Sequence, residues 1–511
     1  MATDMGMSTC ERHGALAAAL LLVAQTAVAQ TEGGANRAIS IVPYATTAAT
    51  YSDNVLLSNA DRRADLMVAV TAGLRVTGEG SRIKGYLNYG LTGQAYADGA
   101  KASTFQNSLN TFGSIEAIDN LAFVDFNGSI SRQAVSAFGV QTDGGIPNSN
   151  QSEVATFRLS PYLRGQLGGS ANYEARYAWT ATRTGTDAAS DAKVADALVK
   201  LNGRVPSGRL AWSVEASRQS VDFTTGRSTE SDRLTATLSY PISNQLVVSG
   251  TGGRDSNNYT NAGRESHSVL GAGINWSPAP TTTLSVNASN QSFGHGHSIS
   301  FEHRTPRTIW RFTDSNGVST APGQLISTTI GSVYDLYFSQ FASIEPDPIK
   351  RALLVNNFLQ TNGVSPSAPV IAGYLTSAVS LLRRQDASFA LLGVRDTVTF
   401  LASRSNSRRL DTVTGAADDL VSSSVIVQQG FSVSYAHRLT PQAAFNAIAS
   451  QQRTIGSSTQ PETSLRTLSL NLTSAVSRQS TATFGARRSV FDSPTVPYSE
   501  SAITGSLTVQ F

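Results

Sequence analysis

The sequence predicts an all-β fold: a transmembrane antiparallel β-barrel of about 22 strands (working range roughly 18–24) with a helical insertion in one long loop. Three observations support this. Apolar and polar residues alternate with a period of two along most of the 511 residues. The alternating segments run roughly ten to thirteen residues, whereas strands of a soluble β-sandwich, which alternate in the same way, average about five or six. Very short turns also alternate strictly with longer polar loops.

The N-terminus has the features of a secretory leader. Arg12 and His13 precede an apolar run over residues 15–24, and Ala27-Val28-Ala29 offers an A-x-A cleavage site. We therefore expect residues 1–29 to be a signal peptide, 30–38 a short periplasmic lead and 39–511 the barrel. The single cysteine, Cys10, would leave with the leader, so the mature chain would have no disulfide and no thiol nucleophile.

The last eleven residues predict the strand that closes the barrel. Apolar or small side chains occupy every second position from residue 503 to the terminal aromatic, which is typical of outer-membrane barrels. This strand should pair with the first strand of the mature protein and leave no open edge for lipid to meet, with both termini in the periplasm. The candidate closing residues are Ile503, Leu507, Val509 and Phe511.

The loops set the strand count. Eleven segments are assigned to the longer class, including the large segment 313–384 and the Gly294-His295-Gly296 segment, which implies about 22 strands. The four tryptophans (Trp179, Trp212, Trp276 and Trp310) fall within predicted strands, mostly toward their ends, as expected for aromatic girdles at the two membrane interfaces.

Charged residues within strands should face the lumen, because a charge facing lipid near the midplane costs roughly 2–4 kcal/mol. Alternation assigns eleven of them to the inner face, which predicts a polar lumen of mixed sign. These residues could form structural ion pairs between strands or take part in solute passage. The candidate lumen charges are Arg82, Lys84, Asp125, Arg158, Glu174, Arg176, Glu215, Arg218, Glu302, Arg304 and Arg311.

The period changes in one stretch, which we assign to a helical insertion over residues 316–384. Asp347-Pro348 has the pattern of an N-cap followed by proline at the first helical position. Residues 333–341 and 369–382 also have a helical pattern. The insertion could cap the outer mouth, fold inward as a plug, or form a surface loop that covers nothing.

Three segments resemble a known family. They are residues 51–55 (Tyr-Ser-Asp-Asn-Val) after Pro43, residues 303–310 (His-Arg-Thr-Pro-Arg-Thr-Ile-Trp), and residues 347–351 (Asp-Pro-Ile-Lys-Arg) leading to 355–359 (Val-Asn-Asn-Phe-Leu). On these segments the mature chain resembles the outer-membrane proteins associated with the PEP-CTERM/exosortase system. The resemblance implies a large barrel that accompanies exopolysaccharide and extracellular-matrix loci in Gram-negative bacteria. It supplies no catalytic residues.

No motif for catalysis stands out. The chain has no P-loop, no HExxH and no GxSxG, and two histidines in a predicted turn, His295 and His297, are a weak metal signal. We expect no enzymatic activity, no cofactor and no bound metal. The small net charge of +3 and the lack of a basic run argue against nucleic acid.

Two functions remain. The first is a conduit for a hydrophilic polymer or solute, gated by the insertion. The second is a non-conducting structural barrel whose loops anchor surface or matrix partners. The lumen of a barrel this wide leaves space inside unless something fills it, which favours the conduit. A TonB-type transporter would need a plug domain before the barrel, and only about nine residues precede the first strand. The expected partners are outer-membrane lipid, the barrel-assembly machinery and polysaccharide-export components.

Overall fold

The computed structural model describes residues 39–142, 146–186, 189–205, 208–320, 334, 337, 338, 351, 355, 373–411, 419–456 and 460–511. The expected leader and periplasmic lead lie outside these residues. Among the described residues, no helix is both long and apolar enough to cross a membrane.

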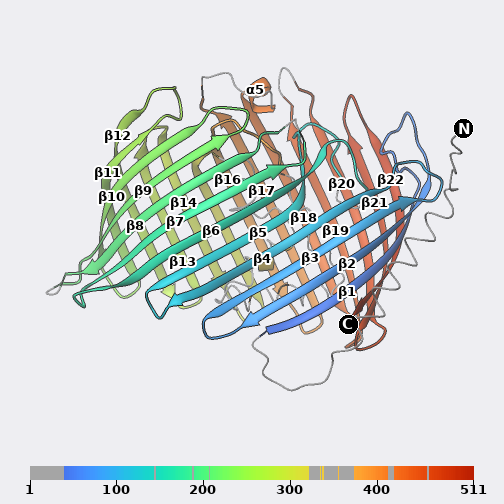
Figure 1. Cartoon of the computed structure of the whole chain (residues 1–511), viewed down its shortest axis with the longest axis horizontal. Coiled ribbons are helices and arrows are strands. Elements are labelled where there is room, and N and C mark those ends of the chain that lie inside the picture. The colour runs from blue at the N-terminus through green and yellow to red at the C-terminus, as the bar shows by residue number, and fades with distance from the viewer. Residues whose placement is uncertain are drawn as a thin grey trace, which may run out of the picture.

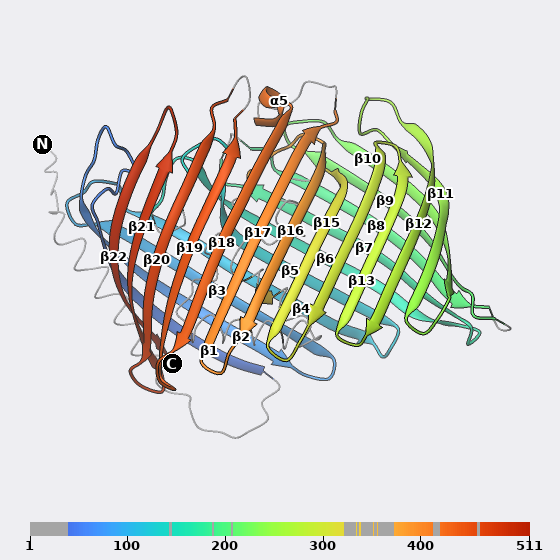
Figure 2. The same ribbon diagram turned by 180° about the vertical axis from the view of Figure 1, so that it is seen from behind.

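A single antiparallel sheet of 22 strands closes on itself, which confirms the predicted fold class (Figures 1 and 2). The strands, ten to seventeen residues long, are β1 (Ile39–Ser52), β2 (Asp65–Glu79), β3 (Ile83–Tyr96), β4 (Thr104–Ile118), β5 (Ala122–Ala134), β6 (Gln151–Leu167), β7 (Ala171–Thr184), β8 (Ala192–Arg204), β9 (Ala211–Phe223), β10 (Thr229–Pro241), β11 (Leu246–Asn257), β12 (Glu265–Ala279), β13 (Thr282–Gln291), β14 (Gly294–Arg304), β15 (Thr308–Ser319), β16 (Ser380–Leu392), β17 (Asp396–Arg409), β18 (Val425–Arg438), β19 (Ala443–Ile455), β20 (Thr463–Ala475), β21 (Ser480–Asp492) and β22 (Tyr498–Gln510).

The connections form two rims. Short turns gather at the rim that also holds the C-terminus, and the longer loops gather at the opposite rim together with the short helix α5 (Asp419–Ser423) (Figure 1). Glycine makes one of the short turns possible, because Gly168 and Gly169 both have positive φ, at 58° and 73°. The expected long loop at Gly294-His295-Gly296 differs, since these residues begin β14 and only two residues separate β13 from β14.

The two faces of the sheet differ as alternation requires. Large apolar side chains point outward along the strands, among them Leu238, Leu270, Phe484 and Ile503, which are 52–69% exposed. A closed apolar outer wall of this kind suits a hydrocarbon environment, because every strand edge is paired. Trp179, Trp276 and Trp310 are likewise exposed on the outer wall.

The seam between β1 and β22 closes the barrel. Nine residue pairs join the two strands, from Tyr44 opposite Gln510 to Ser52 opposite Ala502. Ile503 and Leu507 lie in β22 and are exposed on the outer wall. The terminal Phe511 adds a backbone hydrogen bond to Pro43 at 2.9 Å.

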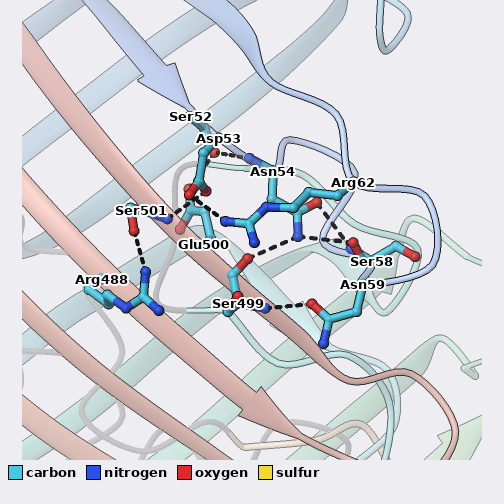
Figure 3. Close-up of polar contacts among 10 residues, drawn as sticks. All are labelled: Ser52, Asp53, Asn54, Ser58, Asn59, Arg62, Arg488, Ser499, Glu500 and Ser501. Atoms are coloured by element: carbon cyan, nitrogen blue, oxygen red, sulfur yellow. Dashed lines mark hydrogen bonds and ion pairs between the residues drawn. The ribbon is translucent and has the colours of Figure 1, made fainter.

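A group of polar contacts, which we call the seam latch, fastens this closure at the long-loop rim (Figure 3). Asn54, with no exposed surface, donates from Nδ2 to the carbonyls of Ser58 (3.0 Å) and Ser499 (2.9 Å). Ser52 donates to buried Glu500 at 3.0 Å, and Asp53 accepts from the Ser501 amide at 2.7 Å. The segment 51–55 that carries the family resemblance therefore ties the first hairpin to the last strand.

Candidate functional site: the lumen

The inner wall carries most of the charged side chains expected there. Arg158 lies between outward-facing Phe157 and Leu159, and Arg176 precedes outward-facing Tyr177. Cross-strand pairing and alternation with exposed apolar neighbours place the same set on the inner face: Lys84, Asp125, Arg158, Glu174, Arg176, Glu215, Glu302, Arg304 and Arg311.

Two of the expected lumen residues lie elsewhere. Arg82 belongs to the turn between β2 and β3, where its guanidinium pairs with Asp119 of the next short turn at 2.8 Å. Arg218 faces outward, because it lies directly opposite Asp232, which shares its face with exposed Leu234. Glu215 and Arg218 are three residues apart, so a period of two puts them on opposite faces.

Arg176 is the centre of an inner ion-pair network that joins three strands. Its guanidinium contacts Asp125 at 3.0 Å, Glu174 at 2.9 Å and the Ser160 hydroxyl at 3.0 Å. It also lies 3.8 Å from the centre of the Tyr162 ring, a cation–π contact. These contacts hold a positive charge in a fixed position on the wall.

Arg158 belongs to a neighbouring, looser group. It pairs with Asp196 at 3.4 Å and keeps 40% of its side chain exposed. Gln219 donates to the same carboxylate at 2.8 Å and accepts from Thr320, the residue just after β15, at 2.9 Å. This group therefore bridges from β6 across the lumen to the end of β15.

Two adjoining cavities of about 570 and 460 Å³ open beside these groups, and both are lined by Arg233, Gln291, Gly317 and Val318. The smaller cavity also meets Arg158, Arg176, Asp196, Asp255 and Tyr259, and the larger meets Glu215 and Asn287. Guanidiniums, carboxylates and amides at this spacing suit a hydroxyl-rich or charged solute. Tyr259, in the loop after β11, lines the smaller cavity, and burial raises its pKa.

Several charged lumen residues lie outside the set expected from sequence. Arg233 pairs with Asp255 at 3.8 Å and also contacts Gln291. Arg384 pairs with Asp386 at 2.7 Å, and Arg487 pairs with Glu500 at 2.8 Å. Alternation could have found Arg233, which precedes outward-facing Leu234. Arg384 could not be found, because the expected insertion, residues 316–384, includes it.

The boundaries of the expected insertion are corrected at both ends. Residues 316–319 belong to β15 and residues 380–384 to β16. Tyr334, Tyr337, Phe338, Arg351 and Val355 are helical, as the pattern predicted. Residues 373–379 are not helical, and the rest of the expected helices lie outside the described residues.

The described helical residues of the insertion meet the inner wall. The Tyr334 hydroxyl lies 3.4 Å from that of Tyr86 on β3. Tyr337 is 2% exposed, and burial raises its pKa while the nearby hydroxyls of Ser434 and Thr399, on the inner faces of β18 and β17, partly oppose the shift. Phe338 stacks on Tyr334 with ring centres 5.7 Å apart, and the Arg351 guanidinium lies 4.8 Å from the Phe338 ring centre. These contacts place this part of the insertion within the lumen.

Long loops cover part of the mouth. In the loop between β5 and β6, the Ser136 hydroxyl and the Ala137 amide donate to Asp419 of α5 at 2.8 and 2.6 Å. The same loop supplies Phe138 to a buried cluster with Tyr374, Ala378 and Leu420. Its Gln141 carbonyl accepts from Tyr498 of β22 at 2.6 Å. This loop thus connects β17–β18 with the closing strand.

The loop between β3 and β4 joins this cover through one lysine. Lys101 Nζ donates to the Pro147 carbonyl at 2.7 Å. Burial lowers the pKa of Lys101 to about 8, because the charged ammonium is partly removed from water.

Nothing in the described ranges resembles a metal centre, since no three His, Cys, Asp or Glu side chains come together there. His295 and His297 lie in β14 instead of a turn, and His297 contacts Asp314 at 3.2 Å.

No family model and no curated protein matches the chain. Solved structures do match in outline. The siderophore receptor PirA from Acinetobacter baumannii is 10% identical over 94% of this chain and 81% of that one, with a TM-score of 0.47. The FrpB iron transporter from Neisseria meningitidis (F5-1 variant) is 9% identical over 92% and 81%, with a TM-score of 0.49. OccAB2 from A. baumannii is 11% identical over 92% and 98%, with a TM-score of 0.34. At such identities and TM-scores these likenesses carry no information about cargo.

Proposed function

We propose that the chain is an outer-membrane barrel that conducts a hydrophilic solute and is gated by the insertion after β15. The long-loop rim faces the cell exterior and both termini face the periplasm. The outer wall supports the location, because its described strands carry large exposed apolar side chains of the kind that contacts lipid.

One observation carries the conduit: open polar cavities lie in the same lumen that Tyr334 and Tyr337 of the insertion enter. The cavities are lined by Arg158, Arg233, Asp196 and Asp255, side chains that solvate a polar solute. Two described residues of the insertion, Tyr334 and Tyr337, lie in the part of the lumen between β3 and β17–β18. Displacement of the insertion would join the two regions into one wider passage.

The resemblance noted from sequence supports a cargo class. We propose an exopolysaccharide or a similar hydrophilic polymer, in a system of the PEP-CTERM/exosortase kind with polysaccharide-export partners. Hydroxyl-rich chains suit a lumen whose fixed charges are balanced in sign and flanked by amides and hydroxyls.

One observation favours the second candidate, a non-conducting structural barrel. The loop between β5 and β6 crosses the mouth and packs against α5 and β22 through buried contacts. A mouth fastened in this way would also suit a closed scaffold that presents its loops to surface partners.

Single-channel conductance in planar bilayers separates the two. We compare the intact chain with a variant in which residues 321–372 are replaced by a short Gly-Ser linker, which leaves β15, β16 and the packed segment 373–379 intact. The conduit predicts a stable conductance that increases several-fold on deletion, because the insertion contacts the wall in the lumen. Silence from both folded proteins would contradict the conduit and favour the scaffold.

A further inference from the structure

A groove on the outer wall lies where the membrane should be. Its volume is about 500 Å³, and it spans β15 to β19 in the half nearer the long loops. Cross-strand register sets its floor and sides: Phe312 pairs with Ala387, Ala387 with Ala402, and Ala402 with Phe431. The two phenylalanines are 37% and 51% exposed on either side of the two small alanines. This apolar trough is open to lipid.

A polar row borders the groove on the side toward the long loops. On each strand, the outward residue two positions from the groove belongs to this row. The strand register aligns five of them: Asp314, Gln385, Arg404, Gln429 and Arg453. A lipid that enters the groove from the long-loop side would therefore pass a row of charged and amide side chains, Arg404 and Arg453 among them, before it reaches apolar surface.

Most charges near the groove are already paired, with one exception in the row. Asp314 binds Arg383 at 2.8 Å and also accepts from Gln385 at 3.0 Å. Arg453 binds Glu462 at 2.7 Å. Arg404, at the centre of the row, makes no hydrogen bond or ion pair with any described residue. Arg408, four residues further along β17 on the same face, is likewise exposed.

The charge around the groove is positive. Four outward arginines (Arg383, Arg404, Arg408 and Arg453) face two carboxylates (Asp314 and Glu462), an excess of two positive charges among the described residues. An unpaired guanidinium on a lipid-facing wall is unfavourable unless it lies near the interface or meets an anion.

We propose that this groove binds a phosphorylated glycolipid of the outer leaflet, with a phosphate on Arg404 and an acyl chain between Phe312 and Phe431. Phosphate accepts charge-assisted hydrogen bonds from the planar guanidinium fork, and the chain covers the apolar trough. The inference rests on the proposed orientation, which puts the long-loop rim in the outer leaflet.

A second copy of the chain fits the groove less well. In a two-fold interface the same patch meets itself, which would bring Arg404 and Arg408 of two copies together. Like charges at such an interface repel, so the charge complementarity favours an anionic lipid.

Native mass spectrometry of the purified, detergent-solubilised protein with added bisphosphorylated lipid A tests the site. We expect one tightly held lipid A, with binding about tenfold weaker in Arg404→Ala, because a hydrogen bond to a charged group is lost. Ala402→Trp, which fills the groove and keeps the charge, should weaken binding comparably. The matched control is Arg254→Ala, which removes an outward arginine of β11 that neighbours Leu234 and Ser268 and lies far from the groove.

Undiminished binding by Arg404→Ala would overturn the site, as would an equal loss in Arg254→Ala. Equal binding of dephosphorylated lipid A or of phosphatidylglycerol would overturn the glycolipid assignment. Conductance measured on the same preparations tests the conduit separately. A barrel that does not conduct but binds lipid A through Arg404 would contradict the conduit and support the lipid site.

Discussion

Arg158 and Arg218 carry the same charge on opposite faces of one sheet. Arg158 points into the cavity beside Asp196, whereas Arg218 points outward to Asp232 and Glu230 at 3.7 Å from each. Alternation alone decides this, and the cost of an outward charge falls to about 0–1 kcal/mol near the interface, where Arg218 lies.

Ion selectivity tests these positions. Replacing Arg158 with Gln removes one positive charge from the lumen, and a charge about 7 Å from a passing ion in water is worth roughly 0.6 kcal/mol. Cations then enter about two- to threefold more easily and anions less easily by the same factor, so the cation-to-anion permeability ratio should rise by about sevenfold, as measured by reversal potential in a salt gradient.

Arg218→Gln is the matched control and should leave the ratio unchanged. A shift of the same size in both variants would show that the ratio does not report lumen charge, or that Arg218 faces inward after all.

For a single charged residue, the sequence predicts the face of the sheet better than the ion-pair partner. Nine of the eleven expected lumen charges lie on inner faces because the period of a strand is fixed. The pairing of Arg176 with Asp125 and Glu174 depends on the register of three strands, and no local pattern encodes that register.

At the scale of elements, the seam latch shows what segment 51–55 does: it fastens the end of β1 to β22. Segment 51–55 ends β1 and reaches β22 through Asn54 and Asp53. Because Asn54 is fully buried, its amide must be paired, and removing it leaves two carbonyls without that donor.

We expect Asn54→Ala to lower the free energy of unfolding by about 1–3 kcal/mol, since it removes two hydrogen bonds donated by a buried amide. Urea unfolding of the protein in micelles, followed by tryptophan fluorescence and by the gel shift of heated barrels, measures this loss.

Arg62→Ala serves as the control within the same latch. The Arg62–Asp53 pair is partly exposed, at 45% and 32% of the side chains, so its loss should cost about 1 kcal/mol or less. Equal losses in the two variants would mean that Asn54 does not fasten the seam.

The ends of strands can be predicted from sequence where turn-forming residues mark them, and not elsewhere. Short turns such as that at Gly168 are marked by glycine. The insertion was placed four to five residues too wide at each end, because β15 and β16 extend beyond the point where their apolar alternation fades. Those strand ends are held by pairing with each other, from Ser319 opposite Ser380 onward.

At the scale of the whole molecule, the closure of the barrel and the filling of its lumen are separate properties. Closure follows from the sequence, because 22 alternating segments with a complementary last strand have one arrangement without free edges. Occupancy does not follow, because contacts such as Tyr334 with Tyr86 join residues 248 positions apart. The structure answers that question for the described residues by placing them inside the wall.

Chemical crosslinking tests whether the insertion gates the lumen through the contact of Tyr334 with Tyr86. Cysteines replace Tyr86 and Tyr334 in a chain that also carries Cys10→Ser, and a flexible bis-maleimide is added to the folded barrel before conductance is recorded. A second pair, Ser300→Cys with Tyr334→Cys, is the control across the lumen and should not crosslink. We expect the Tyr86–Tyr334 pair to crosslink and the conductance then to stay at its low level. A failure to crosslink, or a crosslinked barrel that conducts as well as the deletion variant, would contradict this expectation.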